Sequence, residues 1–274
     1  MSFEFTKMSG AGNDFIVLDS TGNPYSRGPS PGFIAAVCRR GLGVGADGLL
    51  ELLPPSGGEA FRMSYFNSDG GRASMCGNGA RCICSFAHSR GLVNLGEPFD
   101  FTSDSGLHHG LVLTPDSARI WMTEPTVSFL EKPFDLGITC PVSLVDTGVP
   151  HAVVLREGLD DGTFEKMAPV LRRHPGTGAA GANADWAMLL PDGSLSLRTF
   201  ERGVEGETLA CGTGAVAAVM VCLETHPGFR LPASVHVASG LCLTVGRDDR
   251  GWWLSGEARA VYRGILLPEN GPEA

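Results

Sequence analysis

The chain has 274 residues, of which 43% are hydrophobic and 19% charged, and its 38 glycines and 18 prolines are typical of a loop-rich globular protein. The 30 acidic residues outnumber the 21 basic ones, which gives a net charge of −9. Basic residues gather only in short pairs such as Arg39-Arg40 and Arg172-Arg173. Proteins that bind nucleic acid need a basic surface, so we expect no nucleic-acid partner.

The start of the chain mixes charged and aromatic side chains and has no apolar segment of the kind that a secretion signal contains. The longest apolar run, residues 215–223, is far shorter than the roughly 20 residues of a membrane span. We therefore expect a cytoplasmic protein with no membrane role. In that compartment the eight cysteines are expected to be reduced thiols.

Hydrophobic patterning predicts a similar series of elements in each half of the chain. A proline-bearing stretch at residues 114–133 predicts the boundary between the halves, although residues 120–122 inside it read as a strand. The other predicted elements are, in chain order, a strand at 15–18, a helix at 30–39, a helical run at 81–89, a strand at 152–155, a helix at 164–173 and a helical run at 216–224.

An internal repeat supports this division. The motif Cys-Gly-x-Gly-Ala occurs at residues 76–80 and again at 211–215. Three further landmarks recur in the same order and at nearly the same separation: Gly12 with Gly148, Arg39-Arg40 with Arg172-Arg173, and Ala46-Asp47 with Ala184-Asp185. Four ordered landmarks indicate a duplicated half.

The predicted fold class is therefore α/β of the α+β type, with two pseudo-symmetric domains. Each domain is expected to be a mostly antiparallel sheet wrapped around a central helix, with the active site in the cleft between the domains. The N-terminal domain is predicted to span residues 1–120, with the segment 262–274 returning to it, and the C-terminal domain residues 121–261.

Cys76 and Cys211 are the candidate catalytic residues. Each directly precedes a predicted helix, so its sulfur would lie near exposed backbone N–H groups at the positive end of that helix, which favours the thiolate. Two opposed thiols, one ionised and one protonated, can invert a carbon acid: one removes the α-proton and the other protonates the opposite face. This chemistry requires no cofactor.

Three other interpretations are open on the residues alone. Both cysteines could be core residues beside helix-capping glycines. A metal site is disfavoured, because Cys82 and Cys84 would point to different faces of a helix and no Cys-x-x-Cys occurs. The glycine runs at 41–45 and 176–178 match no phosphate-binding motif. Asp47 and Asp185 fit turn or capping carboxylates, and His151 could either tune a thiol or simply end a strand.

Several motifs together resemble the diaminopimelate epimerase family over nearly the whole chain. They lie at residues 7–15, 43–48, 66–70, 76–82, 150–151, 183, 201–203 and 210–215. The resemblance implies a cofactor-independent isomerase that interconverts L,L- and meso-diaminopimelate on the route to lysine and peptidoglycan. It also implies Cys76 and Cys211 as the two acid/base thiols, no metal, and a homodimer, since members are often dimers.

The same resemblance implies roles for further residues. Backbone donors at Gly77, Asn78, Gly212 and Thr213 would bind the carboxylate at the reacting carbon. His151 and Glu201 would support catalysis by holding the substrate amine or tuning the thiols. Asn13, Asn67, Asn183 and Arg202 would recognise the amino-acid substrate, and Arg202 suits a bidentate grip on its distal carboxylate.

Four features depart from the family pattern. Val149 stands where many members have Asn, and Gly48 where some have a substrate-contacting Gln. Glu205 is an extra residue in its loop, and residues 181–185 differ from the usual Thr-Asn-Val-Asn. These differences leave a racemase of another amino acid on the same fold as one alternative. A second alternative, independent of them, is a non-catalytic protein whose halves bind a small anion.

Overall fold

The computed structural model describes residues 3–22, 29–73, 75–156 and 161–266. The chain divides into two compact units: unit 1 comprises residues 1–120 and 255–274, and unit 2 comprises residues 121–254. The return to unit 1 therefore begins at Ser255 and not at residue 262 as predicted. The reason is that the last strand already pairs with the first strand of the chain at Arg259, opposite Ser9. Residues 267–274 of the predicted return lie outside the described part.

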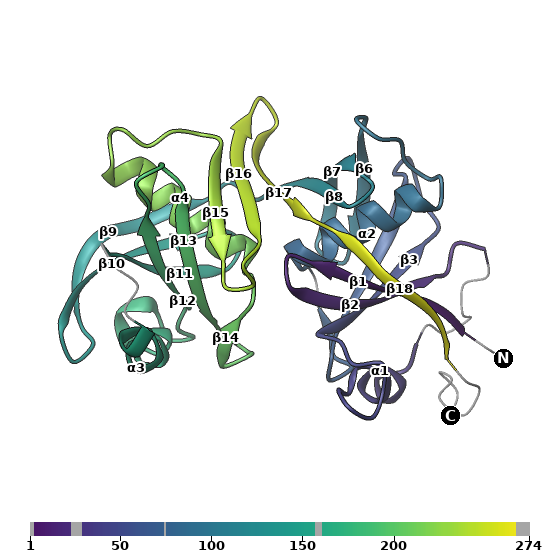
Figure 1. Cartoon of the computed structure of the whole chain (residues 1–274), viewed down its shortest axis with the longest axis horizontal. Coiled ribbons are helices and arrows are strands. Elements are labelled where there is room, and N and C mark those ends of the chain that lie inside the picture. The colour runs from purple at the N-terminus through teal and green to yellow at the C-terminus, as the bar shows by residue number, and fades with distance from the viewer. Residues whose placement is uncertain (1–2, 23–28, 74, 157–160, 267–274) are drawn as a thin grey trace. The chain divides into compact units, whose positions relative to one another are not determined.

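Unit 1 contains a mixed sheet and two helices (Figure 1). Its strands are β1 (Phe3–Gly10), β2 (Asn13–Asp19), β3 (Gly48–Leu53), β4 (Phe61–Asn67), β5 (Arg72–Ala73), β6 (Pro98–Ser103), β7 (Gly106–Thr114), β8 (Ser117–Trp121) and β18 (Arg259–Leu266). Its helices are α1 (Pro31–Cys38) and α2 (Gly77–Ser89). Helix α1 begins where the sequence predicts, because the Ser30 side chain accepts a hydrogen bond from the Phe33 N–H at 3.2 Å.

Unit 2 has the same kinds of element. Its strands are β9 (Thr126–Asp135), β10 (Thr139–Asp146), β11 (Pro150–Arg156), β12 (Asn183–Leu189), β13 (Leu195–Glu201), β14 (Gly206–Thr208), β15 (Ala233–Val237), β16 (Cys242–Asp248) and β17 (Gly251–Glu257). Its helices are α3 (Asp161–Arg172), the short 3-10 helix η1 (Pro175–Thr177) and α4 (Gly212–Thr225). Strands β8 and β17 carry the chain between the units.

The strand pairing confirms the duplication. In unit 1, β1 pairs with β2, β3 with β4, β4 with β5 and β6 with β7 in antiparallel fashion, whereas β2 with β3 and β4 with β6 are parallel. Unit 2 repeats this series with β10 to β16: the pairs β10–β11, β12–β13, β13–β14 and β15–β16 are antiparallel, and β11–β12 and β13–β15 parallel. The predicted fold class, a mostly antiparallel sheet in each half, is confirmed.

The register also shows which residues of the two halves are equivalent. Gly12 and Gly148 are equivalent turn residues, since φ is 113° and 97°, a region that favours glycine. Asp47 and Asp185 are not equivalent, contrary to the sequence-based match. Asp47 precedes β3, whereas Asp185 lies within β12 and pairs with Thr199 of β13. The shift arises because the links between helix and strand differ in length.

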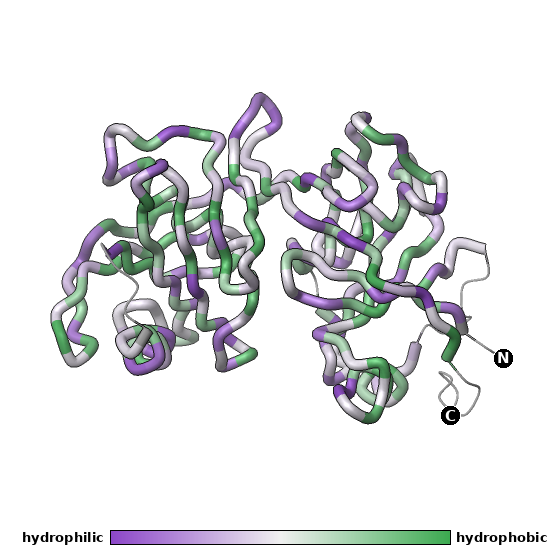
Figure 2. Tube along the Cα trace, viewed as in Figure 1, coloured by the Kyte–Doolittle hydropathy of each residue, from purple (hydrophilic) through white to green (hydrophobic). Residues whose placement is uncertain are grey.

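In each unit the sheet wraps around one helix. Helix α2 contacts β1, β2, β3, β4, β7 and β18, and helix α4 contacts β10, β11, β12, β13 and β16. Every residue of α2 from Asn78 to Ala87 is buried, as expected of a helix covered on all sides. Hydrophobic and hydrophilic residues alternate along many strands of both units, so each sheet has one face toward a core (Figure 2). No helix in the described ranges is both long and apolar enough to span a bilayer.

The aromatic core of unit 1 offers a test of this packing. Phe61 of β4 is fully buried and stacks on Phe101 of β6 with ring centroids 5.1 Å apart. We expect Phe61→Ala to lower the free energy of unfolding by about 3–5 kcal/mol, because it leaves a cavity. Leu42→Ala, at an exposed side chain, should change it by less than about 0.5 kcal/mol. Urea denaturation of both variants checks this; equal stabilities would contradict the packing.

Candidate active site

Each candidate cysteine caps the helix at the centre of its unit. Cys76 is the N-cap of α2, and its Sγ accepts a hydrogen bond from the Gly79 N–H at 3.5 Å. Cys211 is the N-cap of α4, and its Sγ accepts from the Gly214 N–H at 3.4 Å. The helices thus begin at the residue after each cysteine, earlier than the apolar runs at 81–89 and 216–224 predicted. The Gly-x-Gly segment forms the first turn.

Small residues are required in this first turn. A Cβ at Gly79 would lie 3.1 Å from Leu50 Cδ2, and one at Gly214 would lie 2.6 Å from Asp185 Oδ1. Each helix start therefore lies directly on its sheet. The first N–H groups of the two helices, at Gly77, Asn78, Gly212 and Thr213, lie at the positive ends of the helices. Such an end favours an anionic group.

In unit 1 a polar network adjoins Cys76. The Asn78 side chain donates to Asn13 Oδ1, and Asn13 Nδ2 donates to Asp47 Oδ2 at 3.0 Å. Arg81 donates to Asn78 Oδ1 at 2.9 Å. The side-chain amide of the buried Asn78 is therefore engaged within the protein. Asn67, by contrast, is exposed at the end of β4.

Arg81 was not singled out from the sequence, although it follows the Cys-Gly-Asn-Gly-Ala motif directly. Its side chain is fully buried, and it also donates to the carbonyl oxygens of Gly77 at 3.4 Å and Glu257 at 3.5 Å. Burial lowers the pKa of this guanidinium, and the negative potential of nearby groups, Cys76 among them, acts in the opposite direction. A buried cation thus stands beside Cys76.

In unit 2 a buried histidine and carboxylate adjoin Cys211. His151 Nδ1 lies 2.6 Å from Asp185 Oδ2, and both side chains are fully buried. Thr199 donates to Asp185 Oδ1 at 2.7 Å. The sequence suggested that Asp185 is a turn or capping carboxylate, but in the structure it is a strand residue bonded to His151 and Thr199. The contact with Thr199 comes from pairing between neighbouring strands, which no local motif reveals.

The hydrogen bonds assign the protonation of His151. Asn183 Oδ1 accepts the Arg202 backbone N–H at 2.7 Å, so its Nδ2 is the group that faces His151 Nε2 at 3.2 Å. His151 Nε2 must then be an acceptor, which places the single ring proton on Nδ1, toward Asp185. The imidazole is neutral and Asp185 receives two hydrogen bonds, as an ionised carboxylate does.

Glu201 and Cys211 influence each other directly. Glu201 accepts from Thr208 Oγ1 at 2.6 Å. Burial raises the pKa of the Glu201 carboxyl, while hydrogen bonds from Thr208 and Cys211 act to lower it. Burial, followed by the charges of Glu201 and Asp185, raises the pKa of the Cys211 thiol well above its usual value. At Cys211 these effects oppose the helix end, whose backbone N–H of Gly214 acts to lower the pKa of the thiol.

Arg202 and Thr213 lie near Cys211, and two of the positions that depart from the family pattern, Gly48 and Val149, lie at or just before the start of a strand. Arg202 lies beside Asn183, and its guanidinium donates to the Gly181 carbonyl at 3.4 Å. Thr213 Oγ1 lies 3.4 Å from Cys211 Sγ. Gly48 admits no side chain in this backbone, since a Cβ would lie 2.5 Å from the Phe66 carbonyl oxygen. Val149 is half-buried in the turn before β11. The structure therefore gathers Asn13, Gly77 and Asn78 near Cys76, and His151, Asn183, Glu201, Arg202, Gly212 and Thr213 near Cys211.

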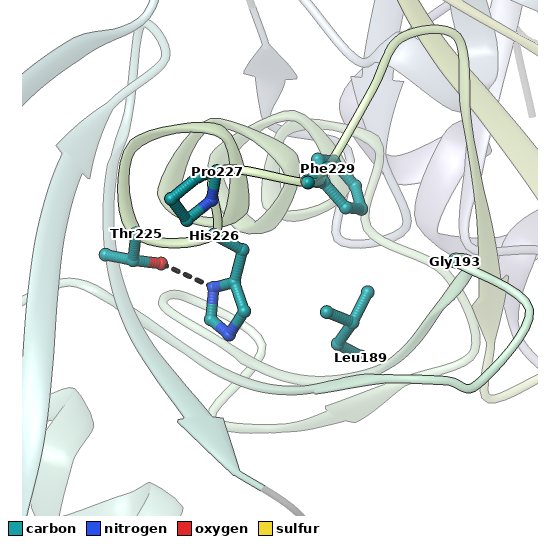
Figure 3. A pocket seen from close by; sticks show the side chains of 7 residues that line it. Leu189, Gly193, Thr225, His226, Pro227 and Phe229 are labelled. Carbon is teal, nitrogen blue, oxygen red and sulfur yellow. Dashed lines mark hydrogen bonds between the residues drawn. The ribbon is translucent and has the colours of Figure 1, made fainter.

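Neither a metal cluster nor the surface pocket competes with these sites. In the part of the chain that the structure describes, no group of three or more His, Cys, Asp or Glu side chains is arranged to hold a metal ion. A pocket of about 280 Å³ is lined by Leu189, Gly193 and residues 225–229 (Figure 3). It lies at the C-terminal end of α4, and a helix of 14 residues is about 20 Å long, so this pocket is remote from Cys211.

Comparison with known proteins first defines the fold. A phenazine biosynthesis protein of the PhzF family from Bacillus anthracis superimposes with a TM-score of 0.74 at 15% identity, covering 97% of this chain and 99% of that chain. At this identity the likeness shows a common fold, the one in which two repeated α+β halves occur.

Sequence comparison then gives the family. The diaminopimelate epimerase family model matches residues 5–124 and 143–261. The diaminopimelate epimerase of Gemmatimonas aurantiaca is 36% identical, covering 96% of this chain and 98% of that protein. The diaminopimelate epimerase of Chlorobaculum tepidum is 38% identical, covering 94% of this chain and 99% of that protein. The chain belongs to the diaminopimelate epimerase family, as the motifs predicted.

Gly214 tests how closely α4 lies on the Asp185 carboxylate. We expect Gly214→Ala to lower the free energy of unfolding by about 1–3 kcal/mol, because the added methyl group overpacks the site. Alanine is otherwise favoured in a helix by up to about 1 kcal/mol, so a net loss must come from this contact. Gly228→Ala, where a Cβ meets nothing within 4 Å, is the matched control. If Gly214→Ala were as stable as Gly228→Ala, the close contact would be refuted.

Proposed function

We propose that this chain is a cofactor-independent isomerase that interconverts L,L-diaminopimelate and meso-diaminopimelate by proton transfer between two cysteine thiols and the substrate α-carbon. Family membership supports the reaction, which belongs to lysine and peptidoglycan precursor biosynthesis. The observation that carries the mechanism is the pair of equivalent cysteines, each held by its sulfur at the start of a central helix.

The proton balance of the reaction needs both sulfurs. The thiolate of one cysteine removes the α-proton, and the electron pair left on carbon is delocalised into the adjacent carboxylate. The thiol of the other cysteine then protonates the opposite face, so that inversion is complete and the two cysteines have exchanged states. The reverse reaction begins from that exchanged state.

The helix starts support the predicted binding of the reacting carboxylate. The backbone N–H groups of Gly77, Asn78, Gly212 and Thr213 lie in first turns, where anions are favoured. We assign them to this carboxylate, because negative charge builds up on it in the transition state. Donors already in place there lower the barrier without reorganising.

Polar side chains around the two helix starts are assigned to the rest of the substrate. Asn13, Asn67, Asn183 and Arg202 would recognise the distal amino-acid group, with Arg202 binding its carboxylate. Because Gly48 admits no side chain, this chain reads the distal group without the Gln that some members carry there. His151 and Glu201 would hold the substrate amine or tune Cys211, whose pKa the charge of Glu201 raises.

Location and assembly are part of the proposal as well. We place the protein in the cytoplasm, where cysteines of this reactivity stay reduced. We also propose a homodimer, on the strength of the family resemblance, and size-exclusion chromatography with light scattering measures it.

Proton NMR in heavy water tests the proposed reaction. We expect the reduced protein, without added cofactor, to replace the α-proton of L,L-diaminopimelate by deuterium and to form the meso isomer. Cys76→Ser and Cys211→Ser should each lower the epimerisation rate by about 10²–10⁴-fold, because serine keeps the N-cap but is a far weaker acid.

Cys242→Ser is the matched control, since Cys242 is exposed on β16, and it should retain full activity. Absence of exchange with the unmodified protein would reject diaminopimelate as substrate. Epimerisation at an undiminished rate in Cys76→Ser or Cys211→Ser would instead reject the two-thiol mechanism.

A further inference from the structure

The duplicated halves differ at equivalent positions of the strands on which the two helix starts lie. In unit 1, β2 pairs with β3 through Phe15 and Gly48, and in unit 2, β11 pairs with β12 through His151 and Asn183. The equivalent cross-strand pairs in the next strands are Leu50–Tyr65 and Asp185–Thr199. Phe15, Leu50 and Tyr65 therefore stand where His151, Asp185 and Thr199 stand in the other half. The sheet beneath the start of α2, at Cys76, thus carries mostly apolar side chains, whereas the sheet beneath the start of α4, at Cys211, carries polar ones.

The helices differ in the opposite sense. Arg81 of α2 and Val216 of α4 are each the fifth residue after their cysteine, so a buried guanidinium in unit 1 corresponds to a buried apolar side chain in unit 2. Asn67 in unit 1 corresponds to Glu201 in unit 2, one residue beyond the equivalent Phe66 and Phe200. At three of these positions the charge differs, and each time in the same sense: Arg81 against Val216 makes the Cys76 half more positive, and Asp185 against Leu50 and Glu201 against Asn67 make the Cys211 half more negative.

Other charged groups around Cys76 leave this difference in place. Glu257, whose carbonyl meets Arg81, has its carboxylate bonded to Ser9 at 3.1 Å and paired with Arg259 at 3.5 Å. Asp14 is paired with Lys7 at 2.8 Å and with Arg40. Asp47 is paired with Arg40 at 2.7 Å. Each of these carboxylates thus has a cation of its own, whereas Arg81 is bonded to an amide and two carbonyl oxygens.

The carboxylates near Cys211 are not paired with the arginine of that site, because the Arg202 guanidinium donates to the Gly181 carbonyl oxygen. His151 is neutral, since its Nε2 accepts from Asn183, so the His151–Asp185 pair carries a net charge of about −1 in a fully buried site. Glu201 adds a second carboxyl group, hydrogen-bonded to Thr208. Negative charge in a site of low dielectric disfavours a second anion, here the Cys211 thiolate.

We propose that these differences fix the resting state of the protein before substrate binds: Cys76 is the thiolate and Cys211 the thiol, with Arg81 and Asp185 as the positioning residues that set this order. The inference rests on the proposed function only in taking the two thiols to be the groups that transfer the α-proton. One turnover moves a proton onto Cys76 and takes one from Cys211. Return to the resting state then requires Cys76 to release a proton to solvent and Cys211 to take one up.

Alkylation by iodoacetamide, a neutral reagent that reacts with thiolates, tests this order without an activity assay. The rate of modification of each cysteine is followed from about pH 5 to pH 11 by peptide mapping. Because accessibility scales a rate but does not move its midpoint, the pH of half-maximal rate reports ionisation. We expect the Cys76 midpoint to lie at least about one pH unit below that of Cys211. Equal or reversed midpoints would overturn the proposal.

Asp185→Asn removes the charge and keeps a side chain of the same shape. We expect this variant to move the Cys211 midpoint to lower pH by at least about half a unit, because the thiolate no longer meets a buried carboxylate, and to leave the Cys76 midpoint in place. Asp192→Asn, an exposed carboxylate in unit 2, is the control for net charge and should move neither. An unmoved Cys211 midpoint in folded Asp185→Asn would remove Asp185 from the account.

The wild-type midpoints decide the proposal even if Asp185→Asn does not fold. They are also independent of whether diaminopimelate is the substrate. If the midpoints show the predicted order but diaminopimelate does not exchange, this inference stands and the proposed function is rejected. If diaminopimelate exchanges but the midpoints are equal or reversed, the proposed function stands and this inference is rejected.

Discussion

The hydrogen bond from a first-turn N–H to a cysteine sulfur is the contact on which the candidate site depends. In unit 1 it runs from Gly79 to Cys76, and in unit 2 from Gly214 to Cys211. A sulfur accepts this bond only if the cysteine occupies the N-cap, and the helix can begin there only if the next turn is small enough to lie against the sheet. The same geometry brings backbone donors to the sulfur. One short motif therefore places the proposed acid or base and a helix start that favours anions together.

Duplication explains why the motif occurs twice, and divergence explains why the two copies are not interchangeable. The strand pairing of the units is the same, so the backbone positions that face each cysteine correspond one to one. The side chains at those positions differ, so the two cysteines have different surroundings. Arg81 in unit 1 corresponds to Val216 in unit 2, and Asp185 in unit 2 corresponds to Leu50 in unit 1. The proposed two-base reaction needs one ionised and one protonated group at a time, and unequal surroundings would supply that difference.

The sequence predicts those features that local patterns encode. The cysteine motif, the flanking apolar runs and the turn glycines Gly12 and Gly148 are enough for the duplication, the central helices and the family. The roles of Asp185 and Arg81 could not be predicted, because they depend on cross-strand register and on burial. Asp185 meets His151 and Thr199 from neighbouring strands, and Arg81 is fully buried although arginine is usually exposed. The return of the chain at Ser255 likewise follows from strand pairing and not from composition.

The central proposal is that one cysteine removes the α-proton from one face of the carbon and the other cysteine delivers a proton to the opposite face. Its most direct test is the isotope content of both isomers at early times in heavy water, starting from L,L-diaminopimelate. The account predicts deuterium at the α-carbon of the meso product, while the recovered L,L isomer stays unlabelled, because the base that takes its proton faces the side from which no deuteron is delivered. Deuterium in both isomers at comparable rates, or protium carried into the product, would show a single base and contradict the account.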